Sequence, residues 1–339
     1  MSNAKIVHHF FPFDRQKVWQ ELGADRLLTA FEQMLLIRHF ELRAEAAYQQ
    51  GQIGGFFHSY VGQEAIQTAA VMAFGERNWW TTSYRCHALA LLLGVTPEEA
   101  MAELYGRSNG NAKGRGGSMH LYADRMLGGF GIVTGQIPIA TGAGFALRYQ
   151  EVEGELSIGF LGDGAVAQGA FHESLNLASL WNLPCVYIIE NNQWGMGTSI
   201  DRALSMRVLA EEIAPAYRMS GYTVDGFDLL ACYSCFNAVK EEVLSSKRPV
   251  LIEAVVGRFK GHSVSDPGLY RLKEQLQEEM KRDPLLQMQQ ALEEAGLLSQ
   301  EQWKELDKRL KQKVLAAMEY AEKSPWPSLA TLESDVFAP

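Results

Sequence analysis

Short apolar runs alternate with segments of helical periodicity through the middle of this 339-residue chain. Residues 156–161, 184–189 and 250–256 form three such runs, with glycine, proline or a charged residue at their ends. Runs of this length with these boundaries are typical of buried strands. Residues 171–180, between the first two runs, place apolar side chains at helical spacing. The pattern therefore predicts a strand–helix–strand unit.

Helical periodicity also dominates other parts of the chain. Residues 27–50 and 63–74 have helical spacing. Thr96 precedes Pro97 and Glu99, which is the arrangement of a capping box with proline in the first turn, so a helix is expected to begin there. Residues 270–323 are charged and amphipathic, which favours helices packed on the surface of a core.

Alternating strands and helices predict an α/β fold with a doubly wound parallel sheet that carries helices on both faces. We expect one domain over residues 1–339. It would comprise a helical lead-in (1–50), a core (51–260) and a helical C-terminal extension (270–330).

Composition narrows the class of protein. With 47% hydrophobic and 21% charged residues, the chain can build a sizeable core. A net charge of -9 argues against nucleic acid or an anionic membrane as a partner, and no apolar stretch reaches the ~18 residues of a membrane span. The first residues, Met1 to Lys5, lack the features of a signal or transit peptide, so a cytoplasmic location is expected. Four cysteines make no disulfide framework, and we interpret Cys232 and Cys235 as part of a buried helix start.

Candidate chemistry lies where the first two strands end. Asp163 stands in a Gly-Asp-Gly string after the first strand, and Asn191 and Asn192 follow the second. Open α/β sheets bind ligands at the carboxyl ends of their strands. Asp163 offers an anionic oxygen and Asn192 a neutral carbonyl oxygen, which suit magnesium with phosphate and water completing its octahedron. Either motif alone is more typical of an ordinary turn, but the two together favour a ligand site.

Asp163 and Asn192, 29 positions apart, resemble the signature of thiamine diphosphate-binding proteins. In that family the aspartate, the second asparagine and a main-chain carbonyl two residues later hold magnesium on the diphosphate. The resemblance therefore implies Asp163, Asn192 and the carbonyl of Trp194 as metal ligands. Relatives often have tyrosine where Trp194 stands, which should not disturb a main-chain ligand.

Further strings extend the resemblance over residues 28–326. They are Gly-Gly-Phe-Phe-His at 54–58, Tyr-Arg at 84–85, a glycine-rich basic string at 112–120, Gly-Ile-Val at 131–133 and Arg-Phe-Lys-Gly-His-Ser-Val-Ser-Asp-Pro at 258–267. Each is weak alone; the glycine-rich string could hold an anion through its N–H groups, but a plain loop is favoured. In this order they resemble the alpha subunits of the decarboxylating, thiamine diphosphate-dependent component of the pyruvate dehydrogenase complex.

The resemblance implies roles at matching positions. The catalytic residues would be His262 and His58, with His262 assisting transfer to lipoyl from a loop, 258–271, that we expect to be mobile while the site is empty. Lys260 stands where many relatives have a second histidine, so we expect it to be a surface or phosphate-side charge. Cofactor-binding residues would be His58, Tyr84, Arg85, Gly131, Val133, Asp163, Gly164, Ala165 and Asn192.

The implied activity is oxidative decarboxylation of pyruvate with reductive acetylation of lipoyl groups on a partner acyltransferase, using thiamine diphosphate and Mg²⁺. In this family a beta subunit supplies the glutamate that activates the cofactor, so the chain is expected to form half of a site in an α2β2 tetramer. The alternatives are an alpha subunit of a branched-chain 2-oxoacid or acetoin dehydrogenase, and a non-catalytic regulatory subunit that keeps the fold. A nicotinamide-binding domain would require Gly-x-Gly-x-x-Gly after its first strand, which the sequence lacks there. Ser263 and Ser265 lie where some relatives are phosphorylated, but plain loop hydroxyls are favoured.

Overall fold

A computed structural model describes residues 7–334 of the chain. Its centre is a parallel sheet with the strand order β2-β1-β3-β4-β8-β7. The strands of this sheet are β1 (Trp79–Ser83), β2 (Met126–Phe130), β3 (Ser157–Gly162), β4 (Cys185–Asn191), β7 (Ser220–Asp225) and β8 (Val250–Val255). A short antiparallel hairpin consists of β5 (Trp194–Gly195) and β6 (Thr198–Ser199).

Helices surround this sheet. The α-helices are α1 (Arg15–Gln49), α2 (Glu64–Phe74), α3 (His87–Leu92), α4 (Pro97–Leu104), α5 (Gln136–Tyr149), α6 (Gly169–Leu180), α7 (Ile200–Ala203), α8 (Leu209–Ile213), α9 (Leu229–Ser246), α10 (Lys273–Met280), α11 (Pro284–Glu294) and α12 (Gln300–Lys323). Within residues 7–334, none of the helices combines the length and the apolar character that crossing a bilayer requires.

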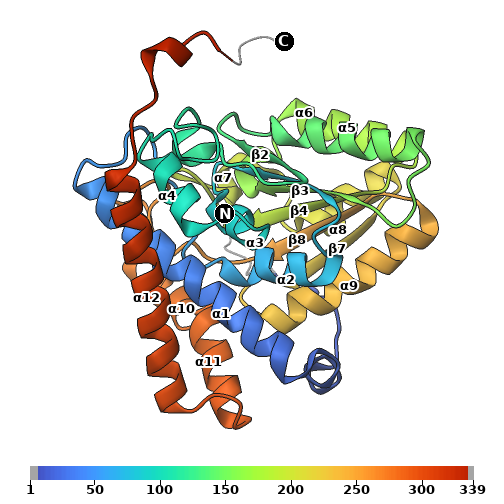
Figure 1. The fold of residues 1–339 in the computed structure, drawn as a ribbon. Coiled ribbons are helices and arrows are strands. Elements are labelled where there is room, and N and C mark those ends of the chain that lie inside the picture. The colour runs from blue at the N-terminus through green and yellow to red at the C-terminus, as the bar shows by residue number, and fades with distance from the viewer. Residues whose placement is uncertain (1–6, 335–339) are drawn as a thin grey trace.

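Two hydrophobic cores lie on opposite faces of the sheet. On β4, Val186 and Ile188 belong to the core shared with α1, α2 and α9. Tyr187 and Ile189, which point the other way because side chains alternate along a strand, belong to the core shared with α6 and α8. Figure 1 shows α5 and α6 on one side of the strands and α2 and α9 on the other. The predicted doubly wound parallel sheet with helices on both faces is therefore confirmed, and double burial explains its continuous apolar strands.

The predicted strand–helix–strand unit is present as β3, α6 and β4. The helix expected over residues 27–50 begins earlier, at Arg15, because Asp14 caps it by accepting the N–H groups of Gln16 and Lys17. Gly23 interrupts its helical geometry with φ 69° and ψ 170°. The capping box expected at Thr96 and Glu99 is also confirmed.

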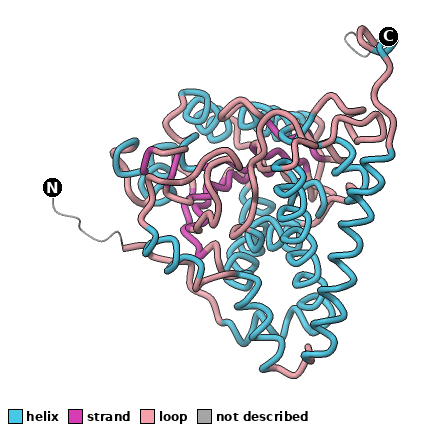
Figure 2. The backbone as a smooth tube through the Cα atoms, turned by 90° about the vertical axis from the view of Figure 1, so that its left-hand side faces the viewer, coloured by secondary structure: helices cyan, strands magenta, loops and turns pink. Residues whose placement is uncertain are grey.

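The helical extension lies beside the lead-in helix. Helix α12 packs along α1 and α4, and α11 packs against α1. Figure 2 shows these long helices reaching away from the strands. The expected surface helices after residue 270 are thus present, with α10 beginning at Lys273.

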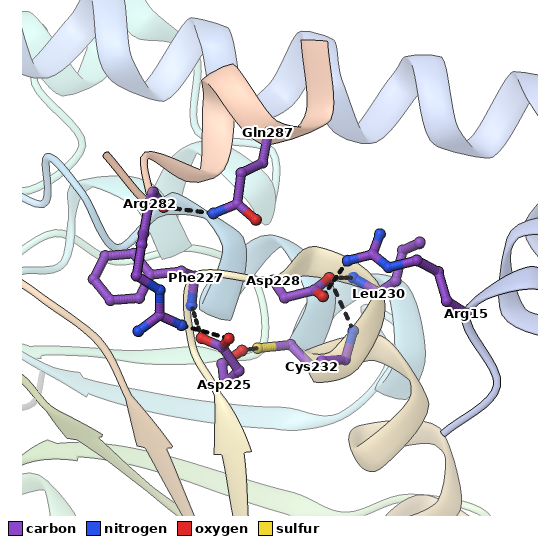
Figure 3. Close-up of polar contacts among 9 residues, drawn as sticks. Arg15, Asp225, Phe227, Asp228, Leu230, Cys232, Arg282 and Gln287 are labelled. Carbon is purple, nitrogen blue, oxygen red and sulfur yellow. Dashed lines mark hydrogen bonds and ion pairs between the residues drawn. The ribbon is translucent and has the colours of Figure 1, made fainter. Parts of the chain in front are cut away.

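Polar contacts join the extension to the carboxyl end of β7. Arg282, before α11, donates to Asp225 at 2.5 Å and stacks over the Phe227 ring (Figure 3). In the first turn of α9, Cys232 donates its thiol to the carbonyl of Asp225 at 3.3 Å. All four cysteines are free and buried. The interpretation of Cys232 and Cys235 as part of a buried helix start is therefore confirmed.

Candidate active site

A cavity of about 550 Å³ opens at the carboxyl ends of the parallel strands. From β1 the chain proceeds to β2 on one side, and then to β3 on the other side of β1. Such a switch point between neighbouring strands is where ligands bind in open α/β sheets. The cavity is lined by every residue that the sequence singled out for the site: His58, Tyr84, Arg85, Gly131, Val133, Asp163, Gly164, Ala165, Asn192, Trp194 and His262.

Two oxygen-bearing side chains stand at the base of this cavity. Asp163 follows β3 and is only 2% exposed, and burial raises the pKa of its carboxyl group to about 6. Asn192 follows β4; its Nδ2 donates to Oε1 of Gln63 at 3.3 Å. Its buried Oδ1 finds no hydrogen-bond partner within residues 7–334. Since buried polar atoms are almost always satisfied, an unpaired oxygen close to a buried carboxyl fits a cation site.

The preceding asparagine has a structural role. Asn191 donates to Oε1 of Glu253 at 2.6 Å and accepts the N–H of Gln193 at 2.9 Å. This clamp holds Gln193 in a left-handed conformation with φ 65°. Asn192 and Trp194 flank this turn and both line the cavity, and the Trp194 carbonyl accepts from Arg258 at 3.5 Å.

Two guanidinium groups line the same cavity. Arg85, after β1, donates to the carbonyls of Ser59 at 2.6 Å and His262 at 2.8 Å. Arg258 is 1% exposed and donates to the hydroxyl of Tyr270 at 2.7 Å. Burial, and then the charge of Arg85, lower the pKa of Arg258 to about 10. Two buried guanidinium groups repel each other, so an anion between them is strongly favoured. A phosphate, which accepts two hydrogen bonds from one guanidinium, suits such a site.

Three aromatic side chains meet at another part of the cavity. The rings of His58 and Tyr84 lie 4.4 Å apart between centroids, and those of His58 and His262 lie 5.1 Å apart. Burial first, and then Arg85, lower the pKa of His58 to about 2 and that of His262 to about 4. Both imidazoles are therefore neutral near pH 7, and His58 Nδ1 has no hydrogen-bond partner among the described residues.

The loop that carries His262 is folded around Asp266. The Asp266 carboxylate accepts the N–H of His262 at 2.6 Å and the hydroxyl of Tyr270 at 2.5 Å. Lys260 instead pairs with Glu45 on α1 at 3.0 Å, in agreement with a charge outside the reaction. The mobility of this loop without cofactor stays a prediction.

Sequence reasoning assigned no role to several cavity residues. Arg258 could have been predicted, because it follows the strand β8 just as Asp163 follows β3, at the same edge of the sheet. Glu190 precedes the asparagine pair; its carboxyl accepts from Tyr60 and, at 3.2 Å, from Gln67, and burial raises its pKa to about 7. Gln136 lies at the start of α5, a helix that the sequence analysis did not identify.

Fold and site together define an α/β chain whose ligand cavity sits at the switch point of a parallel sheet. Residues 32–330 match the family model described as the dehydrogenase E1 component. The chain belongs to this family, and it is a thiamine diphosphate-dependent 2-oxoacid dehydrogenase chain.

Curated relatives match over nearly the whole length. The chain is 40% identical over 315 residues to the pyruvate dehydrogenase E1 component subunit alpha of Rickettsia typhi, covering 92% of this chain and 96% of that protein. It is 38% identical over 319 residues to the protein of the same name from Rhizobium meliloti, covering 93% and 91%. The mitochondrial subunit alpha of Kluyveromyces lactis is 38% identical over 317 residues, covering 92% and 76%.

Proposed function

We propose that this chain is the alpha subunit of a pyruvate dehydrogenase E1 component. It takes part in the oxidative decarboxylation of pyruvate and the reductive acetylation of lipoyl groups on a partner acyltransferase. One observation carries the proposal: eleven residues chosen for this chemistry, from segments far apart in the sequence, line a single cavity. The relatives reported above are pyruvate dehydrogenase chains, so the branched-chain and acetoin alternatives are not favoured.

The cavity residues fit magnesium and a diphosphate. Asp163, the unpaired Oδ1 of Asn192 and the carbonyl of Trp194 are hard oxygen ligands for Mg²⁺. Arg85 and Arg258 supply the positive charge for phosphate oxygens. Gly164 and Ala165 allow the backbone to approach the diphosphate, and Gly131 and Val133 do so for the aminopyrimidine. When bound, thiamine diphosphate supplies the electron sink for decarboxylation.

The two histidines are suited to moving protons. Neutral imidazoles have one ring nitrogen that accepts and one that donates. His58 and His262 lie edge to face, and the His262 backbone is held by Arg85. We propose that both histidines accept and donate protons near the reacting atoms, and that His262 assists acetyl transfer to lipoyl.

A beta subunit in an α2β2 tetramer is the proposed partner. Its support is two sets of exposed apolar side chains: Phe145, Tyr149, Leu180 and Trp181 at the C-terminal ends of α5 and α6, and Ile132 beside the cavity. The rings of Phe145 and Trp181 lie 5.5 Å apart, and Ile132 is 78% exposed beside the cavity-lining Val133. Apolar patches of this kind mark protein interfaces. A cytoplasmic location is also proposed, on the sequence alone.

The test is to purify the chain with and without its co-expressed beta subunit and to measure release of carbon dioxide. The assembled enzyme should require thiamine diphosphate and Mg²⁺ and should prefer pyruvate to branched 2-oxoacids and acetoin. The isolated chain should be inactive. Faster turnover of a branched 2-oxoacid would move the assignment to that alternative, and turnover by the isolated chain would show that the site is complete without a partner.

A further inference from the structure

A single buried carboxylate organises the glycine-rich loop before the cavity. Glu103, in the last turn of α4, is fully buried. Its Oε2 accepts the N–H groups of Ala112 and Gly114, each at 2.9 Å. Its Oε1 accepts those of Gly116 at 2.6 Å and Gly117 at 3.3 Å. The anion that this loop could hold through its N–H groups is therefore part of the chain itself.

The glycines are required by the closeness of this wrapping. Gly114 has φ +78°, and a Cβ there would lie 2.7 Å from the carbonyl oxygen of Gly106. A Cβ on Gly110 would collide with the Glu103 side chain. The glycine content of residues 110–117 thus follows from close backbone approach to a buried carboxylate and to a neighbouring turn.

The wrapped loop leads directly into a wall of the cavity. Ser118 follows Gly117, and its carbonyl lies 2.9 Å from Nε2 of the buried His87. Met119 lines the cavity, and its methyl group lies close to the position that a Cβ on Gly131 would take. His120 then turns back to contact the carbonyl of Gly116 at 2.9 Å. The position of Met119 therefore depends on how the preceding residues are folded.

The other end of the loop meets the C-terminal segment. Ser108 donates its N–H to Pro325 at 3.0 Å, and the Arg107 guanidinium stacks 3.7 Å over the Trp326 ring. In Figure 1, α4 lies beside the end of α12 from which this segment leaves. The loop is thus anchored on both sides, with Glu103 at its centre.

We infer that Glu103 is a positioning residue: its carboxylate folds residues 112–117 and thereby sets the Ser118–Met119 wall of the cofactor cavity. The loop holds Glu103 in place of a phosphate or other external anion. The role at the cofactor rests on the proposed function, whereas the folding of the loop does not.

The experiment compares Glu103→Gln with Glu98→Gln, a half-buried glutamate on the same helix. In Glu103→Gln, the side-chain N–H₂ group replaces one carboxylate oxygen. It cannot accept the hydrogen bonds that this oxygen accepted from two loop N–H groups. Trypsin cleavage after Lys113 and Arg115 should accelerate by about 10-fold or more in Glu103→Gln and stay unchanged in Glu98→Gln. In the enzyme assembled with its beta subunit, the Kd for thiamine diphosphate with Mg²⁺ should rise by about 10-fold, while kcat at saturating cofactor stays within about 3-fold.

Equal cleavage in both variants would overturn the inference. Faster cleavage with an unchanged Kd would overturn the role at the cavity wall. If the natural protein binds no thiamine diphosphate, the proposed function fails and the cleavage result still decides the folding of the loop. If the variant does not fold, hydrogen exchange on the natural chain replaces it. The Glu103-bonded amides of residues 112, 114, 116 and 117 should then be protected far more than those of the exposed residues 153–154, and equal exchange would overturn the inference.

Discussion

Two glycine-rich segments of this chain serve opposite purposes. In residues 110–117 four backbone N–H groups donate to Glu103, whose two oxygens each accept two hydrogen bonds. In residues 162–165 the glycines border the cavity, and a Cβ on Gly162 would meet open space. Glycine provides close backbone approach in both, but a carboxylate from a neighbouring helix fills only the first.

Unpaired buried side-chain atoms are more numerous at the cavity than in residues 110–117, where Asn111 Oδ1 is the one such atom among the described residues. Four cavity-lining side chains have a buried polar atom without a partner inside the described part of the chain: His58, Gln63, Gln136 and Asn192. Such atoms are rare in folded proteins because each carries a desolvation cost. The gathering of four such atoms at one cavity at the strand ends indicates a ligand site, whereas glycine content alone does not.

Substituting one glycine in each segment gives the largest expected contrast. Gly114→Ala should lower the free energy of unfolding by about 2 kcal/mol or more, since a left-handed conformation costs roughly 1–2 kcal/mol and the new Cβ meets the Gly106 carbonyl. Gly162→Ala, with extended backbone and open space, should change it by less than about 0.5 kcal/mol. Urea unfolding at pH 7 measures both. Equal losses would show that the two segments are packed alike.

Asp163 lies in the cavity-bordering segment 162–165, so removing its carboxyl group should affect cofactor binding more than stability. Asp163→Ala should weaken binding of magnesium thiamine diphosphate by at least about 10-fold, or about 1.4 kcal/mol, because a hard oxygen ligand is lost. Arg115 lies in the loop 110–117, and its guanidinium donates to the carbonyl of Ser334 at 2.9 Å. Arg115→Ala should leave the affinity for magnesium thiamine diphosphate within about 2-fold. Calorimetry on the assembled enzyme decides; unchanged affinity in Asp163→Ala contradicts the metal assignment.

The unpaired imidazole at the cavity should make stability depend on pH. The pKa of His58 is lowered to about 2, so below its ordinary value of ~6.5 the unfolded chain takes up a proton that the folded chain does not. The folded state is therefore penalised increasingly as the pH falls from 6.5 towards 2, and not above 6.5. Between pH 7 and 5.5 the free energy of unfolding of the natural protein should fall by about 1 kcal/mol more than that of His58→Gln. The slope of this difference should not exceed about 1.4 kcal/mol per pH unit, the limit for one proton.

Urea unfolding of the cofactor-free chain at several pH values measures this difference. His9→Gln, on a side chain that is 80% exposed, serves as the control and should follow the natural protein. A constant difference between His58→Gln and the natural protein across this range would mean that His58 can be protonated in the folded state.

Strands with continuous apolar sequence were predictable. β3, β4 and β8 are buried on both faces, so their sequences are continuous apolar runs that do not resemble the spacing of an amphipathic helix. β1 escaped prediction because its buried Thr81 and Thr82 read as polar. β2 contains two glycines, and α5 contains Pro138 and Gly144, the latter needed because a Cβ would collide with the Cys185 thiol. Tertiary contacts override local propensity at these elements.

The site residues were predictable to a similar extent. Asp163 and Asn192 follow recognisable strands, and resemblance supplied the others. Glu103 was not predictable, because an isolated glutamate on a short amphipathic helix normally faces solvent. Its burial depends on a loop 9 to 14 residues further along the chain folding over it. Only the three-dimensional structure shows that pairing.

The smallest expected effect concerns the loop after β8. Lys260→Ala removes an ion pair with Glu45 whose lysine side chain is 38% exposed, so it should cost less than about 1 kcal/mol of stability. Transfer of acetyl to lipoyl should stay within about 2-fold, because Lys260 bonds to Glu45 on α1 and does not line the cavity, whereas His262 does. His262→Ala should reduce the same transfer far more while leaving cofactor affinity nearly unchanged. Steady-state assays of both variants with a lipoylated acyltransferase compare them directly. If Lys260→Ala lowers transfer as much as His262→Ala, the charge acts in the reaction and the loop has two functional residues.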